Sequence, residues 1–121
     1  VPKGFPFALD NSFEEVVKTS DLRKSLIALG LQAELTRASA RNVRPGRGKS
    51  RGRKYKKAKG PLIVVSKTCP LIKSAANIAG VDVALCHAIN AELLAPGADA
   101  GRLTLWTRAA VEKVAENNLF M

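Results

Sequence analysis

The feature of this sequence that most limits its fold is a positively charged segment in the middle of the chain. From Arg37 to Lys59 there are eleven lysines and arginines in 23 residues and no acidic residue. The only large apolar side chains in its central part are Val43 and Tyr55, and proline and glycines interrupt any periodic pattern. Such a segment cannot bury enough apolar surface to offset its conformational entropy. We therefore expect residues 39–60 to form an extended loop within a domain, mobile unless an anionic partner holds it.

The rest of the chain has the composition of a folded domain. The sequence has 121 residues, 46% of them hydrophobic, which suits one domain with its own core. Outside the segment stand nine basic and ten acidic residues, so nearly all of the net charge of +10 lies in the segment. Charge concentrated in this way concerns binding partners rather than folding, and its usual partner is a polyphosphate.

Apolar runs alternate with amphipathic stretches along the chain, which predicts an α/β fold. Alternation of this kind favours a small, mostly parallel sheet with right-handed crossovers, in a Rossmann-like three-layer arrangement. Residues 1–121 should form a single α/β domain, incomplete because four strands are few and the chain starts at Val1. Strands are expected at 5–9, 62–65, 81–85 and 103–106, and helices at 12–15, 19–29, 31–38, 70–79 and 90–94, with a last one from 107.

Local signals predict how two of these helices begin. Ser12, with Glu15 three residues later, has the pattern of a capping box. Thr107 is expected to cap the final helix, in which Val111 and Val114 should face the core.

Several classes of protein and site are disfavoured by what the sequence lacks. No stretch reaches the ~18 apolar residues of a membrane helix, and there is no secretory leader, so we expect a soluble intracellular protein without membrane contact. Cys69 and Cys86 are too few for a disulfide framework and are expected to be reduced thiols. These two cysteines and the single histidine make only three possible zinc ligands, and they lack the close spacing in pairs that is typical of zinc sites. The sequence therefore predicts no metal site. Gly48-Lys49-Ser50 matches the end of a phosphate-binding loop, but Val43 stands where that motif needs glycine, so no nucleotide cofactor is expected.

An enzyme remains one alternative. The carboxyl ends of the predicted strands, where α/β proteins place their sites, carry Asp10 and His87. Cys86 and His87 are adjacent, so in a strand they point to opposite faces and form no dyad. Two alternatives to a specific RNA-binding protein therefore stay open. One is a nucleic-acid-processing enzyme that uses Asp10 and His87, and the other is a basic protein that binds DNA or RNA without specificity.

The basic segment itself favours folded RNA as the partner, and no catalytic residue is assigned. It is internal, so it is not a charged tail, and its length exceeds the 5–8 residues of a nuclear-import signal. Arginine offers two-pronged donors to phosphate oxygens, and glycines allow close approach of the backbone. Tyr55 is the only aromatic residue of this segment, so base-by-base reading of single strands is not expected. The predicted RNA-binding residues are Arg41, Arg44, Arg47, Lys49, Arg51, Arg53, Lys54, Lys56, Lys57 and Lys59.

Several motifs in order give the chain a family resemblance. Residues 44–53 (RPGRGKSRGR), 60–65 (GPLIVV), 76–81 (ANIAGV), 90–97 (NAELLAPG) and 101–107 (GRLTLWT) resemble the L-four family of large-subunit ribosomal proteins, of the archaeal and eukaryotic type. The resemblance covers nearly the whole chain, but only the second half of a family member.

The resemblance implies a non-enzymatic constituent of the large ribosomal subunit. It implies large-subunit rRNA and neighbouring ribosomal proteins as partners, in the cytoplasm, with nucleolar assembly in a eukaryote. In that family a Rossmann-like domain lies on the subunit surface and the glycine-arginine segment, here Arg44 to Lys59, penetrates the RNA. Family position adds Arg102 as a further RNA contact. A second family loop, which lines the exit tunnel, precedes the portion present here, so a missing N-terminal portion is a further expected partner.

Overall fold

The four main strands form one parallel sheet. The computed structural model describes residue 5 and residues 8–120. Strands β1 (Ala8–Leu9), β6 (Thr104–Thr107), β4 (Leu62–Val65) and β5 (Asp82–Leu85) lie side by side in that order, and every neighbouring pair is parallel. The predicted α/β fold with a mostly parallel sheet is confirmed. Residues 6 and 7 of the predicted first strand lie outside the described residues.

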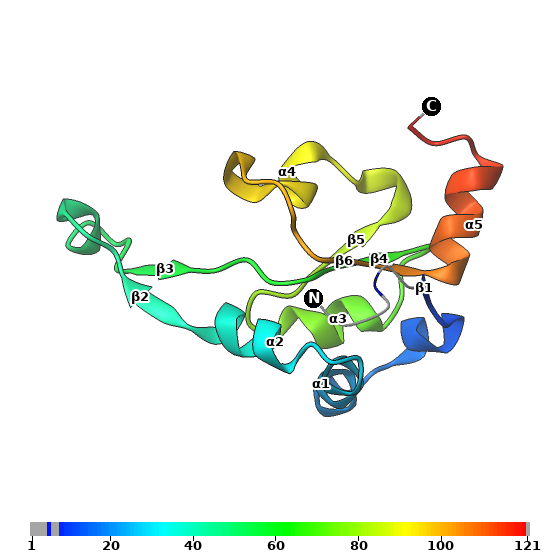
Figure 1. Cartoon of the computed structure of the whole chain (residues 1–121), viewed down its shortest axis with the longest axis horizontal. Helices are drawn as coiled ribbons and strands as arrows, with labels where there is room; N and C mark the ends of the chain where they lie inside the picture. The colour runs from blue at the N-terminus through cyan, green and yellow to red at the C-terminus, as the bar shows by residue number, and fades with distance from the viewer. Residues whose placement is uncertain (1–4, 6–7, 121) are drawn as a thin grey trace.

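Helices cover both faces of the sheet, as the predicted three-layer arrangement requires (Figure 1). On one face lie α1 (Thr19–Ala28), α2 (Gln32–Ser39) and α3 (Leu71–Ala76). On the other lie α4 (Ala91–Leu94) and α5 (Arg108–Glu116).

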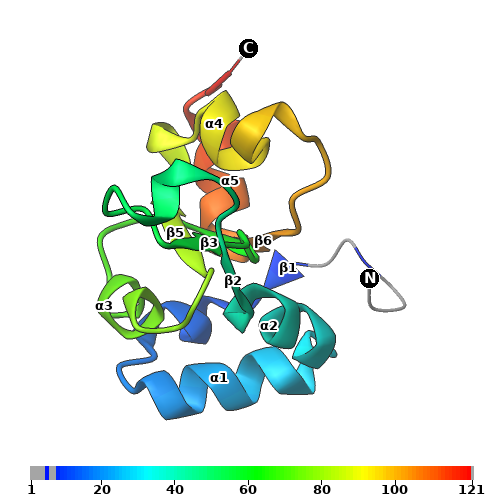
Figure 2. The same ribbon diagram turned by 90° about the vertical axis from the view of Figure 1, so that its left-hand side faces the viewer.

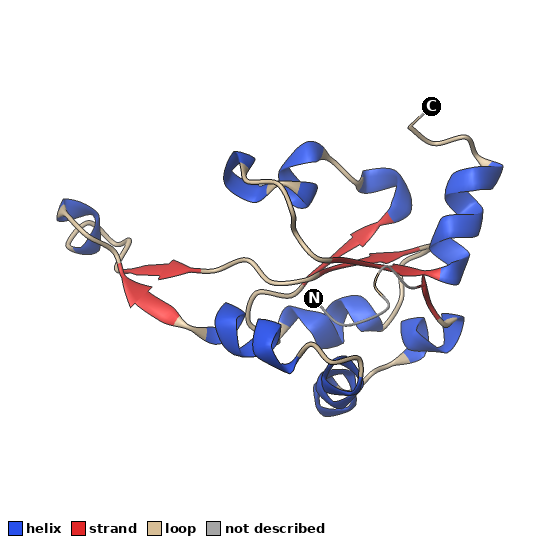
Figure 3. Ribbon diagram, in the orientation of Figure 1, coloured by secondary structure: helices blue, strands red, loops and turns tan. Residues whose placement is uncertain are grey.

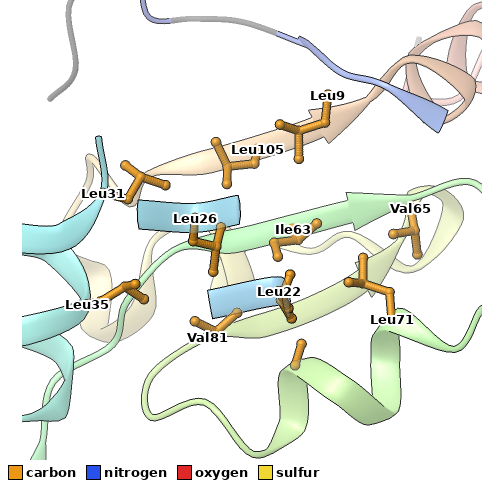
Figure 4. Close-up of a cluster of buried hydrophobic side chains, with 11 residues drawn as sticks. Leu9, Leu22, Leu26, Leu31, Leu35, Ile63, Val65, Leu71, Val81 and Leu105 are labelled. Carbon is orange, nitrogen blue, oxygen red and sulfur yellow. The ribbon is translucent and has the colours of Figure 1, made fainter. Parts of the chain in front are cut away.

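The central strand β4 explains how the core is divided between the two faces. All of its residues are buried, and successive side chains of a strand point to opposite faces. Ile63 and Val65 join a cluster with Leu22 and Leu26 of α1, which are fully buried (Figure 4). Leu62 and Val64 face the opposite layer. A continuous apolar run is thus what a strand covered on both sides needs.

The opposite layer is smaller and corrects one expectation. Ala110 of α5 is fully buried, and Val114, four residues later and on the same helical face, packs partly buried against the same cluster. Val111 is 46% exposed, so the expectation that it faces the core is wrong. The cap is as predicted, because the Thr107 hydroxyl accepts a hydrogen bond from the Ala110 backbone N–H at 3.3 Å.

The first turn after β1 begins differently from the prediction. Residues Asn11–Glu15 form a short 3-10 helix, and its cap is Asp10 rather than Ser12. The Asp10 carboxylate accepts hydrogen bonds from the Ser12 N–H (3.4 Å) and hydroxyl (2.6 Å), so the capping box is wrong. The extended backbone of Asp10 puts its side chain in the capping position.

The thiols and the helix lengths complete the description. Cys86 is buried and Cys69 partly buried, and both are free. Burial raises the pKa of the Cys69 thiol. In the described part of the chain, every helix is too short or too polar to cross a membrane.

Candidate nucleic-acid interface

The basic segment folds into a two-stranded arm that projects from the globular body. Strands β2 (Arg41–Val43) and β3 (Tyr55–Lys57) pair antiparallel, with Val43 opposite Tyr55 and Arg41 opposite Lys57 (Figure 3). We call residues 41–57 the arm. Both strands are exposed along their whole length. We expected an extended loop, and the structure adds that residues 41–43 and 55–57 of this loop pair with each other, because backbone hydrogen bonds can form between the two sides although the segment builds no core.

The tip of the arm is a compact turn made largely by the backbone. A 3-10 turn spans Arg47–Lys49, and the Arg53 N–H donates to the Gly48 carbonyl at 3.0 Å. Gly46 and Gly52 have φ of +78° and +81°, in the left-handed region that side chains rarely adopt. The tip thus needs these two glycines because of the backbone angles. Space is not the reason, since an added Cβ would meet no atom within 4 Å at either position.

The arm carries positive charge without internal compensation. It holds nine of the predicted RNA-binding residues, and none of them forms an ion pair within the described residues. They are Arg41, Arg44, Arg47, Lys49, Arg51, Arg53, Lys54, Lys56 and Lys57. Like charges at this density repel one another, and a bound polyanion would relieve that repulsion.

Two further observations describe side chains of the arm. The Arg41 guanidinium lies 4.9 Å and the Lys54 ammonium 5.5 Å from the centre of the Tyr55 ring. These cation–π contacts orient the two basic side chains. The Nε of Arg44 is buried and, within the described residues, has no hydrogen-bond acceptor. Leaving such a donor unpaired costs about 1–3 kcal/mol.

Two predicted residues lie off the arm, at its base. Lys59 forms an ion pair with Asp82 at 3.0 Å. The Arg102 side chain is only 3% exposed, and it donates to the carbonyls of Gly60 (2.9 Å) and Leu93 (2.8 Å) and to the Asp82 carboxylate (2.5 Å). Its guanidinium is thus hydrogen-bonded within the protein and adds no unpaired cation to the arm, and the RNA contact expected of Arg102 stays a prediction.

The ion pairs at the base predict sensitivity to acid. Burial alone would raise the pKa of Asp82, but hydrogen bonds from Arg102 and Lys59 outweigh it and hold the pKa below the ordinary value of 3.8. A lowered pKa in the folded state contributes stability that is present above the unfolded value and is lost as pH falls through the folded one. We expect the urea concentration at the midpoint of unfolding to decrease as the pH is lowered below about 4. The decrease should be smaller in Asp82→Asn, which lacks the titrating carboxyl group. An identical pH profile for the two proteins would contradict this.

The residues of the enzyme alternative are not brought together. Asp10 follows β1 and His87 follows β5, which are opposite edges of the sheet with two strands between them. At ~4.8 Å between strands, the two positions are roughly 14 Å apart. The described residues contain no group of three or more histidine, cysteine, aspartate and glutamate side chains able to hold a metal ion.

The crevice where α/β sheets usually bind ligands is filled by the protein's own Glu14. The helices that follow β4 and β6 lie on opposite faces, which makes the carboxyl ends of these neighbouring strands the switch point of the sheet. There the buried Glu14 carboxylate accepts hydrogen bonds from the Ser66 N–H (3.0 Å), the Ser66 hydroxyl (3.1 Å) and the Thr107 hydroxyl (2.7 Å). Sequence reasoning did not single out Glu14, since its partners lie 52 and 93 residues away.

Comparison with known proteins gives a consistent family. The model of the "Ribosomal protein L4/L1 family" matches residues 4–117. "Large ribosomal subunit protein uL4" of Halobacterium salinarum is 48% identical over 113 residues, which cover 93% of this chain and 45% of that protein. The proteins of the same name from Methanoculleus marisnigri and Archaeoglobus fulgidus are 48% and 45% identical over 112 residues, or 92% of this chain and 44% of each. This chain thus spans less than half the length of these relatives.

Proposed function

The chain belongs to the ribosomal protein L4/L1 family, and from this premise we propose that it is a structural constituent of the large ribosomal subunit that binds large-subunit rRNA through the arm. The observation that carries the proposal is the set of nine arm cations without an ion pair in the described structure, on a ribbon that projects from a nearly neutral body. The proposed partners are rRNA and neighbouring large-subunit proteins, in the cytoplasmic ribosome, and the proposed role is not enzymatic.

The geometry of the arm suits burial in RNA rather than contact with a single surface. Alternate residues of a strand point to opposite faces, so Arg41 and Lys57 share one face of the ribbon while Lys56 lies on the other. A ribbon that is cationic on both faces can be neutralised fully only by phosphates on both sides.

Binding to rRNA is expected to depend steeply on salt. If about seven arm cations neutralise phosphates, the plot of log K against log salt should have a slope near −5 to −6. Affinity should then fall on the order of a thousandfold between 50 and 200 mM salt. Filter binding or fluorescence anisotropy with a folded large-subunit rRNA fragment measures this.

The same assay tests the proposal against non-specific binding. Competing duplex DNA of equal length should displace the protein from the rRNA fragment poorly. A folded RNA can place phosphates on both faces of the arm, whereas a single straight duplex offers phosphates to one face only. Equal competition by duplex DNA, or a slope shallower than about −2, would contradict rRNA binding through the arm.

A further inference from the structure

We infer that Asp82 and Arg102 are positioning residues for RNA binding: they fix the direction in which the arm leaves the body without contacting RNA themselves. The inference rests on the proposed function of the arm. It concerns the arm root, which we define as Arg37, Ala38, Lys59, Gly60, Gly80, Asp82 and Arg102.

Arg102 connects the returning end of the arm to two other elements of the body. Its three hydrogen bonds reach the Gly60 carbonyl just after the arm, the Leu93 carbonyl of α4 and the Asp82 carboxylate of β5. A guanidinium holds these acceptors in one plane, and almost none of this side chain is exposed. The geometry therefore leaves the chain at Gly60 little freedom to turn.

Asp82 links the same guanidinium to the arm by a second route. Its Oδ2 atom accepts from Arg102 and also from the Lys59 ammonium at 3.0 Å. Two consecutive residues just after the arm, Lys59 and Gly60, are thus tied to one carboxylate, directly or through Arg102. Without this carboxylate, two cations would face each other at the root.

The backbone just after the arm is also bound to α2, from which the arm begins, and to the loop before β5. The Lys59 carbonyl accepts from the Arg37 guanidinium at 2.6 Å, and the Gly60 N–H donates to the Gly80 carbonyl at 2.8 Å. Arg37 is in α2, which leads directly into β2. Both ends of the arm are therefore joined to each other as well as to the body.

Close packing removes the remaining space at the root. A Cβ on Gly60 would lie 2.9 Å from the Ala38 Cβ and 3.0 Å from the Gly80 carbonyl oxygen, and a Cβ on Gly80 would lie 2.7 Å from the Ala38 Cβ. Three segments thus meet at backbone distance where the arm joins the body. Figure 2 looks at the body from the side on which the arm projects. Residues with side chains at Gly60 or Gly80 would force these segments apart.

Rigidity at the root matters because a small rotation there produces a large displacement at the tip of the arm. At about 3.4 Å per residue, the seven residues between Ala38 of the root and Gly46 of the tip span roughly 25 Å. A rotation of about 10° at the root would displace the tip by roughly 4 Å, which is more than the reach of a hydrogen bond. A fixed direction also lowers the entropy lost when the arm is ordered on RNA.

Substitution of Asp82 separates positioning from simple electrostatics, because the two predict opposite signs. Asp82→Asn removes a negative charge near the arm, so electrostatics alone predicts tighter binding to rRNA. Positioning predicts weaker binding, by about tenfold, with an unchanged salt slope. The matched control is Asp99→Asn: Asp99 lines the same groove as Lys59 and Arg102, is exposed, and forms no ion pair within the described residues. It should bind as tightly as the wild type or tighter.

Arg102→Gln and Gly60→Ala complete the test. If Arg102 contacted a phosphate, Arg102→Gln would make the salt slope shallower by about 0.7–0.9. Positioning predicts the same slope at lower affinity, and the same result for Gly60→Ala, which changes no charge. Each variant is titrated well below its own thermal midpoint, so that only folded protein is compared.

The outcomes are distinguishable from failure of the proposed function. Wild-type affinity for rRNA in Asp82→Asn and Gly60→Ala, or a shallower slope in Arg102→Gln, would overturn the inference while leaving rRNA binding by the arm intact. A wild-type protein that binds no rRNA would instead refute the proposed function, and the inference with it.

Discussion

Replacing Arg47, Lys49, Arg51 and Arg53 together with glutamine is expected to lower affinity for rRNA at least a thousandfold near physiological salt. Each hydrogen bond to a charged group contributes about 1.5–3 kcal/mol, so the loss of four exceeds 4 kcal/mol even at partial occupancy. The salt slope should also become shallower by about 3. Anisotropy with the folded rRNA fragment measures both quantities.

The substitution should leave the fold intact, which makes the result interpretable. Residues 47–53 lie at the tip of the arm and contribute nothing to either core cluster. The matched control removes four exposed cations from the body instead: Lys18, Arg23, Lys67 and Lys73. It changes the net charge equally and should weaken binding only a few-fold. If the two variants lost affinity equally, net charge rather than the arm would explain binding.

The sheet could be predicted from the sequence because its information is local. The run from Leu62 to Val65 has no polar residue, and such a run is explained most simply by a strand covered on both faces. Glycine, proline and threonine then mark the boundaries of neighbouring elements. The same reasoning located the charge that defines the candidate interface, since a charge cluster is visible without knowledge of any contact.

The pairing within the arm could not be predicted in this way. Val43 and Tyr55 were the only large apolar side chains of the segment's centre, and they lie directly opposite each other across the ribbon. Their significance depends on the chain turning back between them, which the tip achieves with two glycines in the left-handed region. A basic, glycine-rich sequence gives no periodic signal for such a turn, so the segment resembled an unstructured loop.

The roles of Arg102 and Glu14 depend on contacts between distant parts of the chain. Arg102 lies beside a glycine in a family motif, which suggested an RNA contact, but its partners Gly60 and Asp82 are 42 and 20 residues away. Glu14 lies next to a second acidic residue, Glu15, in a short turn, where an acidic residue would ordinarily be solvated. Only the fold brings each of them to a buried position with several partners.

Replacing Glu14 with alanine is expected to destabilise the protein by about 1–3 kcal/mol, the usual cost of leaving buried hydrogen-bond donors without an acceptor. The change would leave three buried donors, on Ser66 and Thr107, without their acceptor. It would also open a cavity at the switch point of the sheet. Since domains of this size are stable by only ~5–15 kcal/mol, the loss should be visible as a large fall in the urea midpoint.

The neighbouring residue provides the control for this prediction. Glu15 is exposed, so Glu15→Ala should change the free energy of unfolding by no more than ~0.5 kcal/mol. Glu14→Gln should fall between the two, because its amide keeps one acceptor oxygen but places an NH₂ group against the donors. Equal midpoints for Glu14→Ala and Glu15→Ala would show that the network does not hold the carboxyl ends of β4 and β6 together. A ranking of Ala below Gln below wild type would instead assign the stabilisation to the hydrogen bonds themselves, and would explain why a polar residue fills the crevice that comparable sheets leave open for a ligand.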